Sequence, residues 1–87
     1  MNLKVCAIWD SAMEAYGRPI FCQALGQALR SFQDEINRPA EDNNLNKHPD
    51  DFILYELGTF DDNAGRFVCP PDPILLARGK DQVNPPA

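Results

Sequence analysis

One amphipathic segment constrains the fold of this chain more than any other feature. In residues 23–37, apolar side chains recur at spacings of three and four residues, which places them along one side of a helix. This apolar stripe consists of Leu25, Ala28, Leu29, Phe32 and Ile36. Because Pro39 disfavours helical geometry at Arg38, we expect the helix to end near Asn37. The stripe needs a second layer to cover it, either a sheet of the same chain or, as the alternative, a partner.

Strand patterns lie on both sides of this helix. Residues 3–9 alternate between an apolar face and a half-polar face, and residues 52–60 form the second strong strand pattern. Two shorter strand patterns and one candidate edge strand complete the set, at residues 18–22, 66–69 and 74–77. The polar segments between the patterns, residues 11–17 and 40–51, are predicted to be loops.

This order of elements predicts an α+β fold, with a small antiparallel sheet of about four strands and one helix packed on one of its faces. Since 87 residues supply only one small core, we expect a single domain over residues 1–81 and a disordered tail at residues 82–87. We expect the core to contain Trp9, Phe32, Phe52 or Ile53, Leu57 and Phe67.

The charge balance limits how this chain can meet nucleic acid. Its 8 Lys and Arg residues stand against 13 Asp and Glu residues, for a formal net charge of −5. That balance excludes a protein that coats DNA through charge alone. Six of the acids, however, lie in the loop predicted at residues 40–51 and in a hairpin turn predicted at residues 61–65: Glu41, Asp42, Asp50, Asp51, Asp61 and Asp62. A local DNA-contacting face elsewhere on the molecule therefore stays open.

The residues that carry chemistry elsewhere do not form a catalytic pattern here. Cys6, Cys22 and Cys69 are odd in number and widely spaced, so free thiols in a reducing compartment are expected rather than disulfides or a zinc site. His48 has no Cys or Ser at a diagnostic spacing. A metal-dependent nuclease built on Asp10 is an alternative, but a turn-forming Asp is the simpler interpretation. We predict a protein that is not an enzyme and has no cofactor or metal.

Several blocks of residues resemble a known family. Residues 48–62 read HPDDFILYELGTFDD, and three shorter blocks agree with the same family, at residues 8–11, 18–21 and 28–32. Together these blocks resemble a small nonstructural protein of gokushovirus-type microviruses, which are tailless phages with single-stranded DNA genomes. The resemblance covers roughly residues 4–80. It implies a phage-encoded, non-virion protein of the host cytoplasm that binds DNA or takes part in the switch to single-stranded genome synthesis, and it brings no catalytic residues.

We therefore expect an accessory protein of single-stranded DNA genome replication that contacts DNA or the replication complex. The predicted nucleic-acid-binding residues are Lys4, Tyr16, Arg18, Arg30 and Arg66. Tyr16, Tyr55 and Phe67 become candidates for base stacking if they lie on an open sheet face. The alternative is an interaction module without DNA contact that binds a phage or host replication or assembly factor. We expect no membrane contact, and a free sheet edge favours a homodimer.

Overall fold

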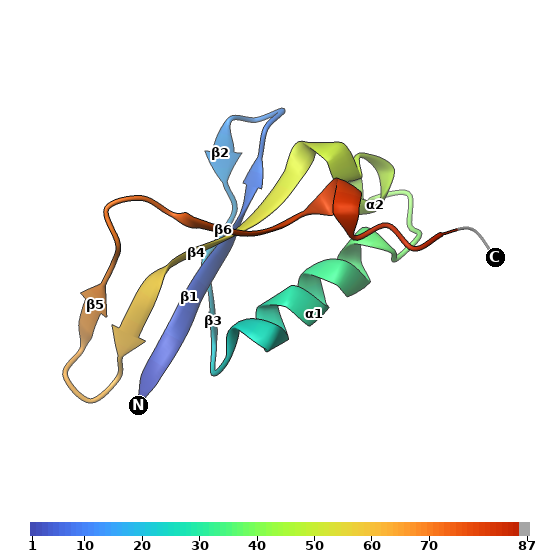
Figure 1. Cartoon of the computed structure of the whole chain (residues 1–87). Helices are drawn as coiled ribbons and strands as arrows, with labels where there is room; N and C mark the ends of the chain where they lie inside the picture. The colour runs from blue at the N-terminus through green and yellow to red at the C-terminus, as the bar shows by residue number, and fades with distance from the viewer. Residues whose placement is uncertain (86–87) are drawn as a thin grey trace.

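A two-layer arrangement of one sheet and one main helix forms the molecule (Figure 1). The computed structural model describes residues 1–85. The strands are β1 (Asn2–Asp10), β2 (Ala15–Tyr16), β3 (Ile20–Cys22), β4 (Phe52–Asp61), β5 (Arg66–Val68) and β6 (Ile74–Arg78). The helices are α1 (Leu25–Ile36) and α2 (Asn44–Lys47), with 3₁₀ turns η1 (Pro49–Asp51) and η2 (Gly79–Asp81). The predicted α+β class, with an antiparallel sheet and one main helix, is confirmed.

The sheet has six strands, so the prediction of about four is wrong. Strands β1 and β4 form a long antiparallel pair at its centre, and each has a second edge. Both β2 and β3 pair with the free edge of β1, while β5 and β6 pair with the free edge of β4. The central strands are 9 and 10 residues long, which gives each edge room for two short strands in succession.

Strand β2 lies in a segment that the sequence predicts to be a loop. Trp9 is opposite Tyr16 and Asp10 is opposite Ala15, so the chain turns back directly after β1. The N–H of Gly17 then donates to the carbonyl oxygen of Ile8 at 2.8 Å and holds the following link to β1. A two-residue strand is too short for a period-two pattern to reveal it.

Helix α1 covers one face of the sheet. Its buried residues Ala28, Phe32 and Ile36 pack in one cluster with strand residues of that face, among them Cys6 and Leu54. The predicted apolar stripe is thus confirmed, with helix bounds inside the predicted 23–37. Over residues 1–85, no helix has the length and apolar character needed to cross a membrane.

The predicted core is only partly right. Phe32 and Phe52 are buried, whereas Trp9 and Leu57 are half-buried and Phe67 is 59% exposed. The reason is that α1 packs on the half-polar face of β1, not on the face that carries Trp9. The polar residues of that half-polar face, Lys4 and Asp10, lie near the two ends of the strand, so only the apolar middle is covered.

The segment 40–51 is more structured than the predicted loop. It contains α2 and η1, and Asn43 is buried at their start. The Asn43 side-chain amide donates to the carbonyl oxygens of Glu35 and Arg38, both at 2.8 Å, and its side-chain oxygen accepts the N–H of Leu45 at 3.2 Å. One side chain therefore caps the C-terminal end of α1 and the N-terminal end of α2.

The C-terminal segment returns to the end of α1 (Figure 1). The Asn37 side chain donates to the carbonyl oxygen of Gln82 and accepts the N–H of Asn84, both at 2.8 Å. Of the tail predicted at residues 82–87, residues 86 and 87 lie outside the described residues.

Candidate nucleic-acid interface

The sheet face opposite α1, here called the open face, carries most of the aromatic side chains. Alternating residues of β1 and their cross-strand partners define this face, since directly opposed residues point to the same side. Six of the eight aromatic residues belong to it: Trp9, Tyr16, Phe21, Tyr55, Phe60 and Phe67. The other two, Phe32 and Phe52, are buried on the helix-covered side.

The six rings form two clusters along the open face. In the first, Tyr16 lies between Trp9 and Tyr55, with ring centroids 4.9 and 5.6 Å apart and edge-to-face orientations. In the second, Phe21, Phe60 and Phe67 contact one another, with centroid distances of 4.8 to 6.2 Å. Such pairs hold each other in place, which gives a semi-rigid aromatic surface that spans β2, β3, β1, β4 and β5.

Small residues lie beneath the rings. Val5 and Ala7 are 5% and 1% exposed although no described helix lies over them. Phe21 is the cross-strand partner of Val5, and Tyr55 is the partner of Ala7. The aromatic side chains therefore bury the middle of the open face themselves, while Tyr16, Phe21 and Phe67 remain 41%, 49% and 59% exposed.

The open face is free of carboxylates along its strands. The acidic strand residues Asp10, Glu56 and Asp61 are opposite Phe52, Cys6 and Asn2, which puts them on the helix-covered side. On the open side, Arg78 is opposite Ile53, which is in turn opposite Trp9. The carboxylates of the strands therefore do not point to this face.

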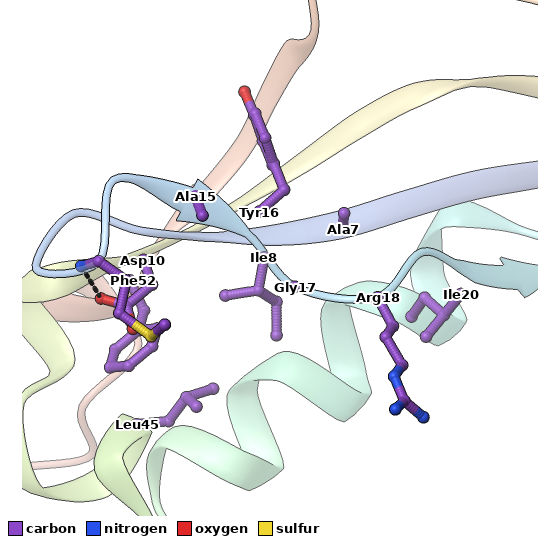
Figure 2. A pocket seen from close by; sticks show the side chains of 11 residues that line it. Ala7, Ile8, Asp10, Ala15, Tyr16, Gly17, Arg18, Ile20, Leu45 and Phe52 are labelled. Atoms are coloured by element: carbon purple, nitrogen blue, oxygen red, sulfur yellow. Dashed lines mark hydrogen bonds between the residues drawn. The ribbon is translucent and has the colours of Figure 1, made fainter.

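The predicted phosphate contacts do not share a face with Tyr16. By register, Lys4 and Arg66 point to the helix-covered side, and Arg30 is exposed on α1. Arg18 lies in the link from β2 to β3 and points to the side of the sheet where α1 lies, whereas the Tyr16 ring points to the opposite side (Figure 2). Their contact with phosphate stays a prediction.

The sequence interpretation missed four residues of this face: Trp9, Phe21, Phe60 and Arg78. The signal was present in the alternation of residues 3–9, which separates Trp9 from Cys6 and Ile8. Both faces of that strand carry apolar residues, so alternation alone does not tell which one the helix covers.

The titratable group with the largest change lies on the opposite, covered side. Burial raises the pKa of the Cys6 thiol to about 12, with the neighbouring Cys22 as a further cause. Cys6 is fully buried in the core cluster, so it is a neutral packing residue at physiological pH. Within residues 1–85, no three His, Cys, Asp or Glu side chains gather in a way that suits a metal ion.

Comparison with known proteins gives one match. A family model described as "Phage ORF5 protein" matches residues 3–82, which is nearly the whole chain. Neither the curated proteins nor the solved structures gave a match.

Proposed function

The chain belongs to the Phage ORF5 protein family, and from this premise we propose that it is a nonstructural accessory protein of single-stranded DNA genome replication that contacts the DNA through its open face. The observation that carries the proposal is the pair of aromatic clusters on a sheet face without a helix over it. Proteins that bind single strands stack successive bases on exposed aromatic rings, at roughly 1–3 kcal/mol per base.

The exposed rings suit such stacking. Tyr16, Phe21 and Phe67 each leave about half of their surface free, and each is held from the side by another ring. A held ring loses little conformational entropy when a base covers it. Because every base has a π-face, contact of this kind tolerates any genome sequence.

The electrostatics favour few phosphate contacts. Arg78 is the cation on the open face, and the strand carboxylates point to the other side. Asp61 and Asp62 directly follow Phe60 in the β4–β5 hairpin, within the distance of about 8–10 Å over which charges act at physiological salt, so they oppose further phosphate contacts there. Arg18 lies between β2 and β3, and Arg66 lies in β5, so both are at the outer edges of the sheet. A DNA strand that extends beyond the aromatic rings crosses these edges.

The test is a titration of the protein with a short labelled oligothymidine, followed by anisotropy over a salt series. We expect binding to weaken as salt rises. The slope of the logarithm of the association constant against the logarithm of the salt concentration should indicate one to three phosphate contacts, on the order of −0.7 per phosphate. The single tryptophan gives a second readout, because Trp9 contacts Tyr16 and its fluorescence should be quenched when bases stack nearby.

Matched variants separate stacking from general charge. Tyr16→Leu and Phe67→Leu keep an apolar side chain but remove a ring, and each should weaken binding by about fivefold or more. Arg78→Gln should reduce the salt slope by about one phosphate. Lys80→Gln is the control, because it removes an exposed cation of η2 outside the open face. Absence of binding at low salt and tens of micromolar protein, or binding unchanged in both ring variants, would refute the proposal.

One observation favours a second candidate function, an interaction module without DNA contact. With a single cation and exposed Phe67 and Leu75, the open face also suits a protein partner such as a phage or host replication or assembly factor. Copurification from infected cells that persists after nuclease treatment, with no oligothymidine binding, would favour this candidate.

The homodimer expected from the free sheet edges stays a prediction, and sedimentation over a concentration series measures it directly.

A further inference from the structure

A hollow lies beside β1, between the segment 13–20 and Leu45 of α2. Its volume is about 330 Å³. Ile8 points from β1 toward Leu45 of α2, and Phe52 lies at one end (Figure 2). Met13 also lines the hollow. This hollow, here called the edge pocket, is thus almost entirely apolar. Tyr16 and Ala7 of the open face also line it, although the Tyr16 ring points away, so the edge pocket adjoins the open face.

The local chain path leaves this space unfilled. Ala15 is opposite Asp10 and lines the pocket with only a methyl group. Gly17 follows, tied to Ile8 by its N–H, and adds no side chain to the wall. Residues 11–21 are exposed, so the pocket opens to solvent along this segment. Apolar lining that stays in contact with water is a source of free energy for a ligand that displaces the water.

The rim of the edge pocket offers one free positive charge. Arg18 lines the pocket, and neither ion pair of residues 1–85 includes it, since these join Met1 to Asp62 and Glu35 to Arg38. Asp10 also lines the pocket, and its Oδ1 accepts the N–H groups of Ala12 and Met13, at 3.0 and 3.4 Å. Asp10 lies at the Phe52 end and Arg18 at the opposite end, so an anionic ligand group is favoured only at the Arg18 end (Figure 2).

The neighbouring backbone can hold an extended segment. Strand β3 pairs with β1 along one edge, and no described strand pairs with its other edge. An added strand at such an edge places alternate side chains into adjacent pockets. Ile20 of β3 lines the edge pocket, so a side chain from a segment near this edge can reach it.

We propose that the edge pocket binds a partner protein through one large apolar side chain, Leu, Met or Phe, that is flanked by an acidic residue. The apolar side chain fills the space between Ile8, Leu45 and Phe52, and the acid pairs with Arg18. The volume is at the lower end for ligand pockets, which suits one side chain rather than a large cofactor. This site adjoins the proposed DNA-contacting surface, since Arg18 and Tyr16 line it, and its apolar part is formed by Ile8, Leu45 and Phe52.

The experiment is a ¹⁵N–¹H correlation titration of the full chain with a blocked peptide, acetyl-Asp-Leu-Phe-Asp-amide. Saturable shifts are expected at the amides of Ile8, Gly17 and Leu45. A peptide with Lys in place of Asp should bind about fivefold more weakly, because it replaces an attractive charge by a repulsive one. A peptide with Ser in place of Leu and Phe should not bind. Equal shifts for all three peptides, or shifts confined to Trp9 and Tyr55, would overturn the proposal.

Two variants test the pocket itself. Ala15→Leu fills the hollow from an exposed strand position and should abolish the shifts, while Arg18→Gln should make the Asp and Lys peptides bind alike. Lys80→Gln is the control and should change neither result. Ala15→Leu should still bind oligothymidine and Phe67→Leu should still bind the peptide, so failure of one proposal is distinguishable from failure of the other. Peptide binding that survives Ala15→Leu in a folded protein contradicts the proposed site.

Discussion

The two faces of the sheet are built from the same central strands but achieve burial differently. On the covered face, Cys6 and Leu54 are buried because α1 lies over them and contributes Phe32 and Ile36. On the open face, Ala7 is equally buried although no helix covers it, because neighbouring aromatic rings shield it. One face is thus a closed core, and the other is an ordered surface whose outer rings still meet water.

The comparison shows that an apolar sheet face does not always indicate a core. Aromatic side chains are large enough to cover small residues and leave part of their own surface exposed. The energetic expectation differs accordingly: a covered residue contributes to stability, whereas an exposed ring is available for a ligand. Four substitutions or measurements test this contrast, beginning with the largest expected effect.

Phe32→Ala should lower the free energy of unfolding by about 3–5 kcal/mol, since it removes a fully buried ring that α1 inserts into the covered face. Urea denaturation followed by circular dichroism measures the change. A loss below about 1 kcal/mol, the range of surface changes, would show that the covered face is not the main core.

Gly58→Ala should cost roughly 1–3 kcal/mol. Gly58 has a φ of 156°, and an added Cβ would lie 2.4 Å from the carbonyl oxygen of Val68, so the close approach of β5 requires glycine here. Gly26→Ala in α1 is the matched control, because an added Cβ meets nothing within 4 Å and alanine favours helix. In the same denaturation assay, Gly26→Ala should be at least as stable as the wild type. If Gly58→Ala has unchanged stability, the close contact between β4 and β5 is contradicted.

The rate of cysteine alkylation should differ between Cys6 on the covered face and the exposed Cys69. Cys69 is exposed, whereas Cys6 is buried and has its pKa raised to about 12, so at pH 8 its thiol stays neutral and shielded. We expect Cys69 to react with iodoacetamide at least about tenfold faster than Cys6, equivalent to about 1.4 kcal/mol. Mass spectrometry of digested protein measures the two rates, and Cys69→Ser verifies the assignment. Equal rates in the native protein, with denatured protein as reference, would contradict the closed covered face.

Phe67→Ala should have the smallest effect on stability, about 1 kcal/mol, because the ring is 59% exposed and loses mainly its contacts with Phe60 and Phe21. Urea denaturation beside Phe32→Ala gives the direct comparison. If both substitutions cost the same, the open face is a second core and the distinction between the two faces fails.

The local sequence determined most of the elements. The three- and four-residue spacing from Leu25 to Ile36 predicted α1, because a helix places those side chains on one side regardless of what covers them. Alternation predicted β1 and the strong pattern at 52–60 predicted β4. The sequence indicates Tyr16, Tyr55 and Phe67 as stacking candidates on the condition of an open face, and the register puts all three on that face.

The choice of which face of β1 forms the core depends on long-range packing. Cys6 and Ile8 on one side and Val5 and Ala7 on the other are all apolar, so local preference does not choose between them. The choice comes from long-range pairing: Phe52 and Leu54 of β4 join Cys6 and Ile8 under α1, while Tyr55 joins Trp9 on the other side. The fold also places Arg30 on α1 and Tyr16 on the open face of the sheet. No local sequence pattern predicts where cations that are scattered along the chain will lie in the folded protein. The local sequence thus specifies the long elements α1, β1 and β4, and the packing of distant segments determines which side chains remain available for a partner.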